Sequence, residues 1–381
     1  MRAFVSILLM LLCVATSSAK VICGAERTDE WLRLLKDQRV ALLANHTAIV
    51  GSEHLLDVMI AKGVNVVAVV APEHGFRGTA DAGEKIDSSV DHKTGLPIWS
   101  LYSSTSRRLT PEQVAQFDVI VVDMQDVGLR FYTYYITMLS VINNAAGGGK
   151  RVVVFDRPNP NGMYIDGPIL DMRYKSGVGA LPIPVVHGLT MGEIAKMAIG
   201  EGWCKHCALD IVRCKGYTHQ TRYSLPVAPS PNLRSMQAIY LYPSTCLFEG
   251  TICSLGRGTD YPFEVYGHPS IKSDFSFTPR SMAGAKYPPH RDRACYGVDL
   301  RSIPHEEIIA NGFNLEYMID AYRKVGIGEA FFTPFFEKLV GVDYIRKMII
   351  EGCSANEIRA RWRDDLERYR ILRRKYLLYK E

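Results

Sequence analysis

The chain of 381 residues is too long for one ordinary hydrophobic core, so its length favours two domains. Hydrophobic residues at 47% and charged residues at 22% are typical of a globular protein. The net charge of +5 is too small to indicate nucleic-acid binding, and we expect no nucleic-acid partner.

The first 19 residues have the pattern of a signal peptide. Arg2 supplies the positively charged n-region, and residues 3–15 form a largely apolar h-region. Ser17, Ser18 and Ala19 are small residues that precede a predicted cleavage site after Ala19. The apolar stretch is too short to span a bilayer as a helix, and no later segment is apolar for long enough. We therefore expect an exported protein, periplasmic, cell-surface or secreted, without stable membrane insertion.

Predicted strands and helices alternate over residues 20–203. Near-continuous apolar runs predict strands buried on both faces at residues 39–45, 65–71, 117–122 and 151–155. Helices are predicted at residues 54–62 and 132–146, and capping boxes begin further helices after Thr110 and Thr190. This alternation predicts an α/β fold with a doubly wound parallel sheet.

Residues 204–381 are predicted to form a second, smaller, β-rich domain. After Trp203 the chain has short strand-like segments, many Gly and Pro residues and few helical patterns. A capping box at Ser354 and Glu357 predicts a last helix. The apolar face of this helix consists of Ile358, Trp362, Leu366, Tyr369 and Leu372.

Eight of the nine cysteines follow residue 19, and Cys204, Cys207 and Cys214 lie close together in the sequence. A zinc site there needs a fourth ligand, from His206 or a distant cysteine. A redox role for the C-x-x-C motif needs a thioredoxin-like setting, which the sequence lacks. The simpler interpretation is a local disulfide or buried thiols, and we expect no metal site.

Polar residues follow four predicted parallel strands. They are Asn45 and His46, the segment 72–75, the segment 123–126, and the segment 156–158. Ligands of open α/β sheets bind beyond the carboxyl ends of the strands. One such group alone is explained by a helix cap or a loop contact, but four together predict a functional site.

Several kinds of chemistry lack their motifs. The first strand is not followed by G-x-G-x-x-G, and neither a Walker sequence nor a G-x-S-x-G elbow is present. We therefore expect no nucleotide and no other cofactor. Carboxylate chemistry remains, and glycoside hydrolysis needs one carboxylic acid and a second group at the anomeric centre. The candidates are Glu73, Asp123, Asp126 and Glu249, with helix capping as the alternative for Asp126.

Five ordered motifs resemble the exo-β-N-acetylmuramidase family of peptidoglycan recycling. They occupy residues 72–78, 126–134, 156–162, 229–233 and 248–259, and the segments 187–193 and 374–379 also fit. The resemblance implies release of terminal β-1,4-linked N-acetylmuramic acid from the non-reducing ends of glycan fragments. It also implies a Rossmann-like domain packed on a smaller β-barrel-like domain, with the active site in the cleft between them.

One departure from the family pattern motivates an alternative. Leu255 stands where the family usually has an acidic residue, and Ile252 where it has Asn. The alternative is a catalytically inactive sugar-binding protein on the same fold. A further hypothesis is a hydrolase of another carboxylated amino sugar. The leading interpretation keeps a small peptidoglycan-derived glycan, of the N-acetylmuramic acid–N-acetylglucosamine type, as the partner.

The predicted catalytic residues are Glu73, as general acid, Glu249 and Asp126. The predicted substrate-binding residues come from the strand ends and motif loops: His46, His74, Arg77, Gln125, Arg130, Tyr132, Asn159, Asn232 and Arg257. A guanidinium suits the lactyl carboxylate of muramic acid, because Arg binds a carboxylate through two parallel hydrogen bonds. Four arginines lie in the motif loops, and they are Arg77, Arg130, Arg157 and Arg257. Arg130 is the first choice and Arg77 the second, while a structural ion pair is the alternative for each of the four.

Overall fold

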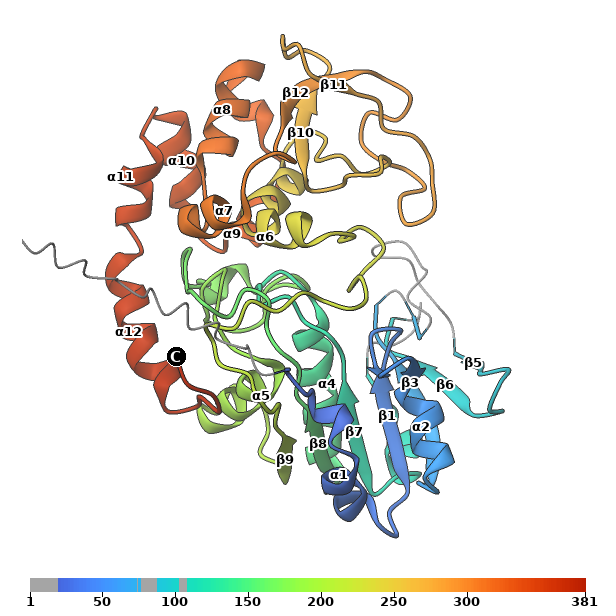
Figure 1. Cartoon of the computed structure of the whole chain (residues 1–381). Coiled ribbons are helices and arrows are strands. Elements are labelled where there is room, and N and C mark those ends of the chain that lie inside the picture. Colours follow the sequence, from blue (N-terminus) through green and yellow to red (C-terminus); the bar gives the residue numbers. More distant parts are fainter. Residues whose placement is uncertain (1–19, 74, 77–87, 103–107) are drawn as a thin grey trace, which may run out of the picture.

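The computed structural model describes residues 20–73, 75–76, 88–102 and 108–381. Residues 20–235 form a unit around a large sheet, the sheet unit, and residues 236–381 form the C-terminal unit (Figure 1). The predicted signal peptide, His74 and Arg77 lie outside the described residues. Within the described ranges, no helix is long and apolar enough to cross a membrane.

The sheet unit contains a seven-stranded sheet. Its order is β5 (Ser89–Val90), β6 (Pro97–Ser100), β4 (Val66–Ala71), β1 (Val40–Ala44), β7 (Val119–Asp123), β8 (Arg151–Phe155) and β9 (Leu209–Val212). All neighbouring pairs are parallel except the edge pair β5–β6. Counted along the chain, the six parallel strands have the Rossmann order 3-2-1-4-5-6. The predicted Rossmann-like α/β fold is confirmed.

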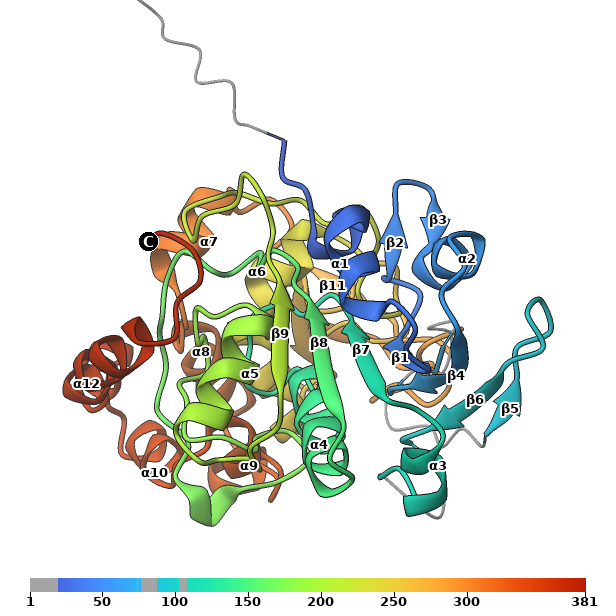
Figure 2. The same ribbon diagram turned by 90° about the horizontal axis from the view of Figure 1, so that it is seen from below.

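Helices cover both faces of this sheet, which explains why its central strands are apolar throughout. On one face, Val40 and Leu42 of β1 pack in a cluster with α1 (Thr28–Leu35) and α2 (Leu55–Ala61). On the other, Ala41 and Leu43 pack with α4 (Tyr134–Gly147) and α5 (Met191–Gly200). Figure 2 shows the two helical layers on opposite sides of the strands. The doubly wound arrangement follows from this burial.

The predicted capping boxes begin three helices. Thr110 caps α3 (Pro111–Ala115), Thr190 caps α5, and Ser354 caps α11 (Ala355–Ala360). In each, the hydroxyl oxygen accepts from the main-chain N–H three residues on, and the side chain of that residue binds the cap's own N–H. These helix starts are set by local sequence alone.

The C-terminal unit has more helix than the sequence predicted. Its sheet has three antiparallel strands in the order β10 (Val265–His268), β12 (Cys295–Asp299) and β11 (Ser276–Phe277). Its helices are α6 (Met236–Thr245), α7 (His305–Asn311), α8 (Glu316–Val325), α9 (Phe336–Val340), α10 (Tyr344–Ile350), α11 and α12 (Arg363–Arg374). The prediction of few helices after Trp203 is wrong, because several of these helices are only five to seven residues long and show little periodicity.

Short elements complete the described chain. The hairpin of β2 (Ile49–Val50) and β3 (Glu53–His54) follows β1. The 3-10 helices are η1 (Gly24–Glu26), η2 (Met172–Tyr174), η3 (Cys246–Gly250) and η4 (Gly328–Phe331).

The strand β9 corrects the predicted domain boundary. It follows Trp203, where the second domain was expected to begin, but it pairs with β8 in the large sheet. Its sequence, Leu-Asp-Ile-Val, is short and only partly buried, because β9 lies at the sheet edge. Residues 204–235 therefore belong with the sheet unit.

The C-terminal end of the chain returns to the sheet unit. The predicted last helix is split into α11 and α12, and its predicted apolar residues Ile358, Trp362 and Tyr369 are buried. The Tyr379 hydroxyl donates to Asp156 Oδ2 at 2.7 Å, beyond the end of β8, and the Leu378 N–H donates to Glu193 Oε1 at 2.8 Å. Figure 1 shows α12 running along the side of the sheet unit. Residues 378 and 379, near the end of the chain, therefore link the C-terminal unit to the sheet unit by hydrogen bonds.

Candidate active site

A pocket lies where the sheet unit and the C-terminal unit meet. The sheet unit supplies Glu73 and residues 131–134, and its last residues before α6, 228–235, here called the connecting segment, supply Ser230, Asn232 and Leu233. The C-terminal unit supplies Tyr242, Glu249, Arg257 and Phe263. Glu73, Tyr132, Asn232, Glu249 and Arg257 were predicted from the sequence, and the fold brings these five together.

Glu73 is held at the end of β4. That strand ends at Ala71, and the Glu73 residue is only 9% exposed. The hydroxyl of Thr133, the residue before α4, donates to Glu73 Oε2 at 2.6 Å. The carboxyl group is thus placed by a buried strand on one side and by the start of a buried helix on the other. This position suits a group that must meet a reacting atom precisely.

Glu249 and Arg257 form an ion pair on the wall that the C-terminal unit supplies. Arg257 Nη2 and Nε donate to Glu249 Oε1 at 2.5 and 3.0 Å. The guanidinium also lies over the Phe263 ring, 5.0 Å from its centroid. Burial alone would lower the pKa of Arg257, but the charge and hydrogen bonds of Glu249 outweigh it and raise that pKa. The pocket therefore holds both a carboxylate and a cation on this wall.

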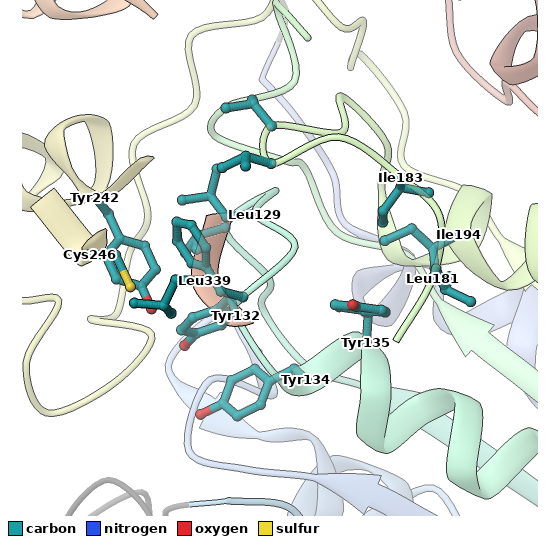
Figure 3. Packing of buried hydrophobic residues seen from close by; sticks show 14 of the residues in the cluster. Leu129, Tyr132, Tyr134, Tyr135, Leu181, Ile183, Ile194, Tyr242, Cys246 and Leu339 are labelled. Atoms are coloured by element: carbon teal, nitrogen blue, oxygen red, sulfur yellow. The ribbon is translucent and has the colours of Figure 1, made fainter. Parts of the chain in front are cut away.

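Tyrosine hydroxyls and a histidine fix the connecting segment. Tyr132 and Tyr134 both donate to the Pro229 carbonyl, at 2.9 and 3.2 Å, and His46 Nε2 lies 2.8 Å from the Ala228 carbonyl oxygen. Figure 3 shows Tyr132, just before α4, and Tyr134, at its start, on the side toward Tyr242, whereas Tyr135 points toward Leu181 and Ile194. His46 and Tyr132 thus place the segment that carries Ser230 and Asn232.

Asn232 is also held within the protein. Its Nδ2 donates to the Gly284 carbonyl at 2.7 Å, and the residue is 4% exposed. It contributes to the pocket wall, and its side-chain amide links the connecting segment to the loop that precedes β12.

Arg130, the first choice for reading the lactyl carboxylate, does not face the pocket. It is fully buried, and its guanidinium donates to the main-chain carbonyls of Pro168, Ile183, Leu339 and Val340 at 2.7–3.0 Å. Arg130 is not placed at this pocket, because main-chain acceptors from both units already occupy the guanidinium.

Two other predicted binding residues also serve the framework. Gln125 Nε2 donates to the Asp126 and Pro158 carbonyls, both at 2.8 Å. Asn159 Nδ2 donates to the Leu189 carbonyl at 2.9 Å, and its Oδ1 accepts from the Asn161 N–H at 2.8 Å. Both side chains are buried and hold strand-end loops in place, and neither lines the pocket.

The ion-pair alternative holds for Arg157. Its Nε and Nη2 donate to the two carboxylate oxygens of Asp123 at 2.5 and 2.9 Å, and both side chains are buried. Asp123 is therefore a structural anion at the end of β7, and neither residue is available to a sugar.

Asp126 lies near the pocket but does not line it. Its Oδ1 accepts from the Gly128 N–H at 2.7 Å, which fixes a turn, and its buried Oδ2 has no hydrogen-bond partner among the described residues. Burial raises the pKa of Asp126 to about 7. The alternative role of Asp126 as a helix cap is close to what the structure shows, except that Asp126 fixes a turn and not a helix end. A contact between Asp126 and the glycosidic bond is not supported, because Asp126 does not line the pocket.

We predict a pH-dependent contribution of Asp126 to stability. Because its folded pKa lies above the usual 3.8, the folded protein holds this proton more tightly than the unfolded chain. The contribution is complete below about pH 4 and is lost as the pH rises through about 7. In denaturant titrations, Asp126→Asn should gain stability relative to wild type between pH 4 and pH 8, by up to about 4 kcal/mol.

The matched control is Asp118→Asn, an exposed carboxylate whose pKa is lowered by its hydrogen bonds with Arg39. That variant should not gain stability relative to wild type over the same range. A constant difference between Asp126→Asn and wild type from pH 4 to pH 8 would show that Asp126 is ionised throughout.

The cysteines that suggested a zinc site are buried thiols. Cys204, Cys207 and Cys214 are unpaired in the structure. In the part of the chain that the structure describes, no group of three or more His, Cys, Asp or Glu side chains is arranged to hold a metal ion.

Sequence reasoning missed Thr133, Ser230, Tyr242 and Phe263, which line the pocket. Thr133 and Ser230 lie inside recognised motifs, so their position in the sequence is the signal that could have found them. Tyr242 and Phe263 lie outside those motifs, and only the packing of α6 and the 255–263 loop against the sheet unit brings them to the site.

Comparison with known families agrees with this geometry. The sequence models of "Exo-beta-N-acetylmuramidase NamZ", N-terminal and C-terminal, match residues 40–237 and 240–379. The chain belongs to the exo-β-N-acetylmuramidase NamZ family. The two NamZ matches meet just after the start of α6, close to the boundary between the sheet unit and the C-terminal unit.

Three relatives extend the match over most of the chain. Peptidoglycan beta-N-acetylmuramidase NamZ of Bacillus subtilis (strain 168) is 36% identical over 372 residues, which cover 92% of this chain and 89% of that protein. A DUF1343 family protein of Bacteroides fragilis NCTC 9343 is 52% identical with a TM-score of 0.90, covering 95% of this chain and 100% of that one. A second from the same organism is 28% identical with a TM-score of 0.83, covering 94% and 99%.

Leu255, the position of the departure, does not line the pocket of this NamZ family member. Leu255 is 3% exposed and belongs to the hydrophobic core, and its carbonyl accepts from the Phe263 N–H at 2.7 Å. The loop of residues 255–263 is therefore held by a main-chain hydrogen bond at this position. The observation that suggested an inactive sugar-binding protein does not remove a group from the pocket.

Proposed function

We propose that the protein is an exo-acting glycoside hydrolase that releases terminal β-1,4-linked N-acetylmuramic acid from the non-reducing ends of peptidoglycan fragments. The observation that carries this proposal is the meeting of Glu73 with the Glu249–Arg257 pair at one pocket, in a chain whose two parts match the two NamZ domains. The proposed substrate ends in N-acetylmuramic acid linked to N-acetylglucosamine.

Glu73 is assigned the role of general acid, which gives a proton to the leaving oxygen. A glycosidic oxygen is a poor leaving group until it is protonated, and a buried, rigidly placed carboxylic acid can protonate it. The Thr133 hydroxyl holds one oxygen of the Glu73 carboxyl group at 2.6 Å, which limits rotation about the last bond of the side chain.

Glu249 is assigned the role of the second catalytic carboxylate, beside Glu73. Its ion pair with Arg257 keeps it oriented within a partly buried wall. A negative charge there stabilises the positive charge that develops on the sugar ring in the transition state. Asp126 is left out of this assignment, because it does not line the pocket.

The deciding experiment is turnover of a purified preparation with three substrates. These are the 4-nitrophenyl β-glycosides of N-acetylmuramic acid and N-acetylglucosamine, and the muramic acid–glucosamine disaccharide. The proposal expects release of N-acetylmuramic acid from the first and third. Binding of the muramic acid compounds without turnover would instead establish the sugar-binding alternative. Neither binding nor turnover of them would favour a hydrolase of another carboxylated amino sugar.

Arg257 is assigned to the lactyl carboxylate that distinguishes muramic acid from N-acetylglucosamine. It was among the four arginines considered from the sequence, and it lines the pocket, whereas Arg130 and Arg157 are engaged elsewhere. Its Nε and Nη2 both bind Glu249 Oε1, and a substrate carboxylate can share this cation.

Arg257→Ala should lower kcat/KM for the muramic acid glycoside by at least about 10-fold, since a hydrogen bond to a charged group contributes about 1.5–3 kcal/mol. Any turnover of the N-acetylglucosamine glycoside should fall less, so the ratio between the two substrates changes. Arg173→Ala, which removes an exposed arginine paired with Asp171, is the matched control and should keep the wild-type ratio. An unchanged ratio in a folded Arg257→Ala variant excludes this role.

We also propose that the protein acts outside the cytoplasm, in the periplasm, at the cell surface or in the medium. The pattern of residues 1–19 and the location of peptidoglycan support this proposal. Mass spectrometry of the protein from its native cells should find a new N-terminus near Lys20, and an intact first 19 residues in the cytoplasmic fraction would contradict it.

A further inference from the structure

Two cysteines far apart in sequence lie opposite each other on neighbouring extended segments. Ile22 and Lys215 form an antiparallel bridge in which each main-chain N–H donates to the other's carbonyl, both at 2.9 Å. In an antiparallel pair the next residues across are one step forward on one segment and one step back on the other. Those residues are Cys23 and Cys214.

This register places the two cysteines within reach of a disulfide. Next to a pair that exchanges both hydrogen bonds comes a pair without them, in which the Cα atoms are about 4.5 Å apart and the side chains share a face. Disulfides span Cα distances of roughly 4.4–6.8 Å. Both cysteines are buried, at 3% and 7% exposed, so both side chains lie inside the protein.

The neighbouring Cys214 thiol, which itself donates to the Asp156 carbonyl at 3.2 Å, lowers the pKa of Cys23, and the nearby charge of Arg157 lowers it further. Cys23 in turn raises the pKa of Cys214. Cys23 also lines a second pocket of about 420 Å³, together with Arg157 and Tyr223, whereas Cys214 does not line it. Cys23 is therefore the thiol that a reagent reaches first.

We propose that Cys23 and Cys214 form a disulfide when the protein meets a thiol–disulfide exchange donor such as glutathione disulfide. The Cys23 thiolate attacks one sulfur of the donor, which forms a mixed disulfide and releases one glutathione thiolate. The Cys214 sulfur then attacks the Cys23 sulfur and displaces the second glutathione. The two cysteines lose two electrons and two protons, and the donor leaves as two thiols.

The bond would close a loop that contains all seven strands of the large sheet. It joins the segment before α1 to the segment after β9, so the strands from β1 to β9 lie between the linked residues. A covalent link across so long a loop restricts the unfolded chain strongly. We expect the melting temperature to rise by about 5 to 10 °C on oxidation. This inference does not depend on the proposed glycosidase activity.

The direct test maps the bond in the wild-type chain. The purified, reduced full-length protein is incubated with glutathione disulfide, blocked with N-ethylmaleimide in denaturant, digested without reduction and analysed by mass spectrometry. The expected product is a peptide pair linked through Cys23 and Cys214. Recovery of both residues as maleimide adducts, or linked to other cysteines such as Cys204 or Cys207, overturns the proposal.

Single variants test the effect on stability. Oxidation should raise the melting temperature of wild type and of the control Cys353→Ser, which removes a partly exposed thiol. It should not raise that of Cys23→Ser or Cys214→Ser. A full rise in Cys23→Ser overturns the proposal, and if the buried variants fail to fold, the wild-type mapping decides alone.

Discussion

Replacing Glu73 with Gln is expected to lower turnover of the muramic acid–glucosamine disaccharide by a factor of about 10² or more, because general acid catalysis typically contributes that much. Gln has the shape of Glu and can still accept the Thr133 hydroxyl through its amide oxygen, so the fold should be retained. It has no acidic proton to give to the leaving oxygen.

The nature of the leaving group separates a proton donor from other roles. 4-Nitrophenol leaves as a stable anion and needs little protonation, so Glu73→Gln should lose much less activity on the nitrophenyl glycoside than on the disaccharide. Glu249→Gln should impair both substrates to a similar degree, because Glu249 is assigned to the developing charge on the sugar ring. Glu351→Gln, a change at an exposed position, is the control.

A folded Glu73→Gln variant that hydrolyses the disaccharide at a near-normal rate would exclude Glu73 as the acid. Equal losses on both substrates would instead move Glu73 to the role given to Glu249. Circular dichroism and melting temperature establish that each variant is folded before its rates are compared.

Much of the sheet unit could be predicted because it rests on two kinds of sequence signal. These are the apolar runs of strands buried on both faces and the short capping motifs at helix starts. Val119 to Val122 are apolar because helices cover both faces of β7, and such a run has few interpretations besides a buried strand. Thr110 and Thr190 cap helices through residues three positions away, so the signal is contained in four residues. Features that need only near neighbours in sequence are readable without a structure.

Polar strand ends were a less exact guide to the site. Glu73 reaches the pocket, but Asp156 accepts hydrogen bonds from Thr190, Gly192 and Tyr379, and Asp123 binds Arg157. The same residue types serve catalysis in one loop and hold loops or the chain terminus in another. Sequence marks the edge of the sheet where the site lies, but tertiary contacts decide which of its side chains remain available to a ligand.

Arg130 shows why a motif residue need not touch the substrate. Its guanidinium binds the Leu339 and Val340 carbonyls at the carboxyl end of α9, where a positive charge is favourable, and Pro168 and Ile183 in the sheet unit. Gly341, with a φ of 75°, lies so close that an added Cβ would come within 2.6 Å of Arg130 Nη2. Arg130 therefore joins the two units that form the pocket.

Replacing Arg130 with Met is expected to lower the free energy of unfolding by about 4 kcal/mol or more, because buried carbonyls that lose their partners cost about 1–3 kcal/mol each. The melting temperature should fall by roughly 10 °C. Arg130→Lys should lie in between, since an ammonium group keeps the charge but has three donors in place of the planar guanidinium.

The exposed Arg173→Ala variant should stay within about 0.5 kcal/mol of wild type, because surface ion pairs contribute little. Loosening the contact between the two units should slow turnover of muramic acid and N-acetylglucosamine glycosides by the same factor, since Arg130 touches neither sugar. If Arg130→Met kept wild-type stability and changed only the ratio between the two substrates, the guanidinium would belong to the lactyl site after all, and the inferred role in joining the units would be wrong.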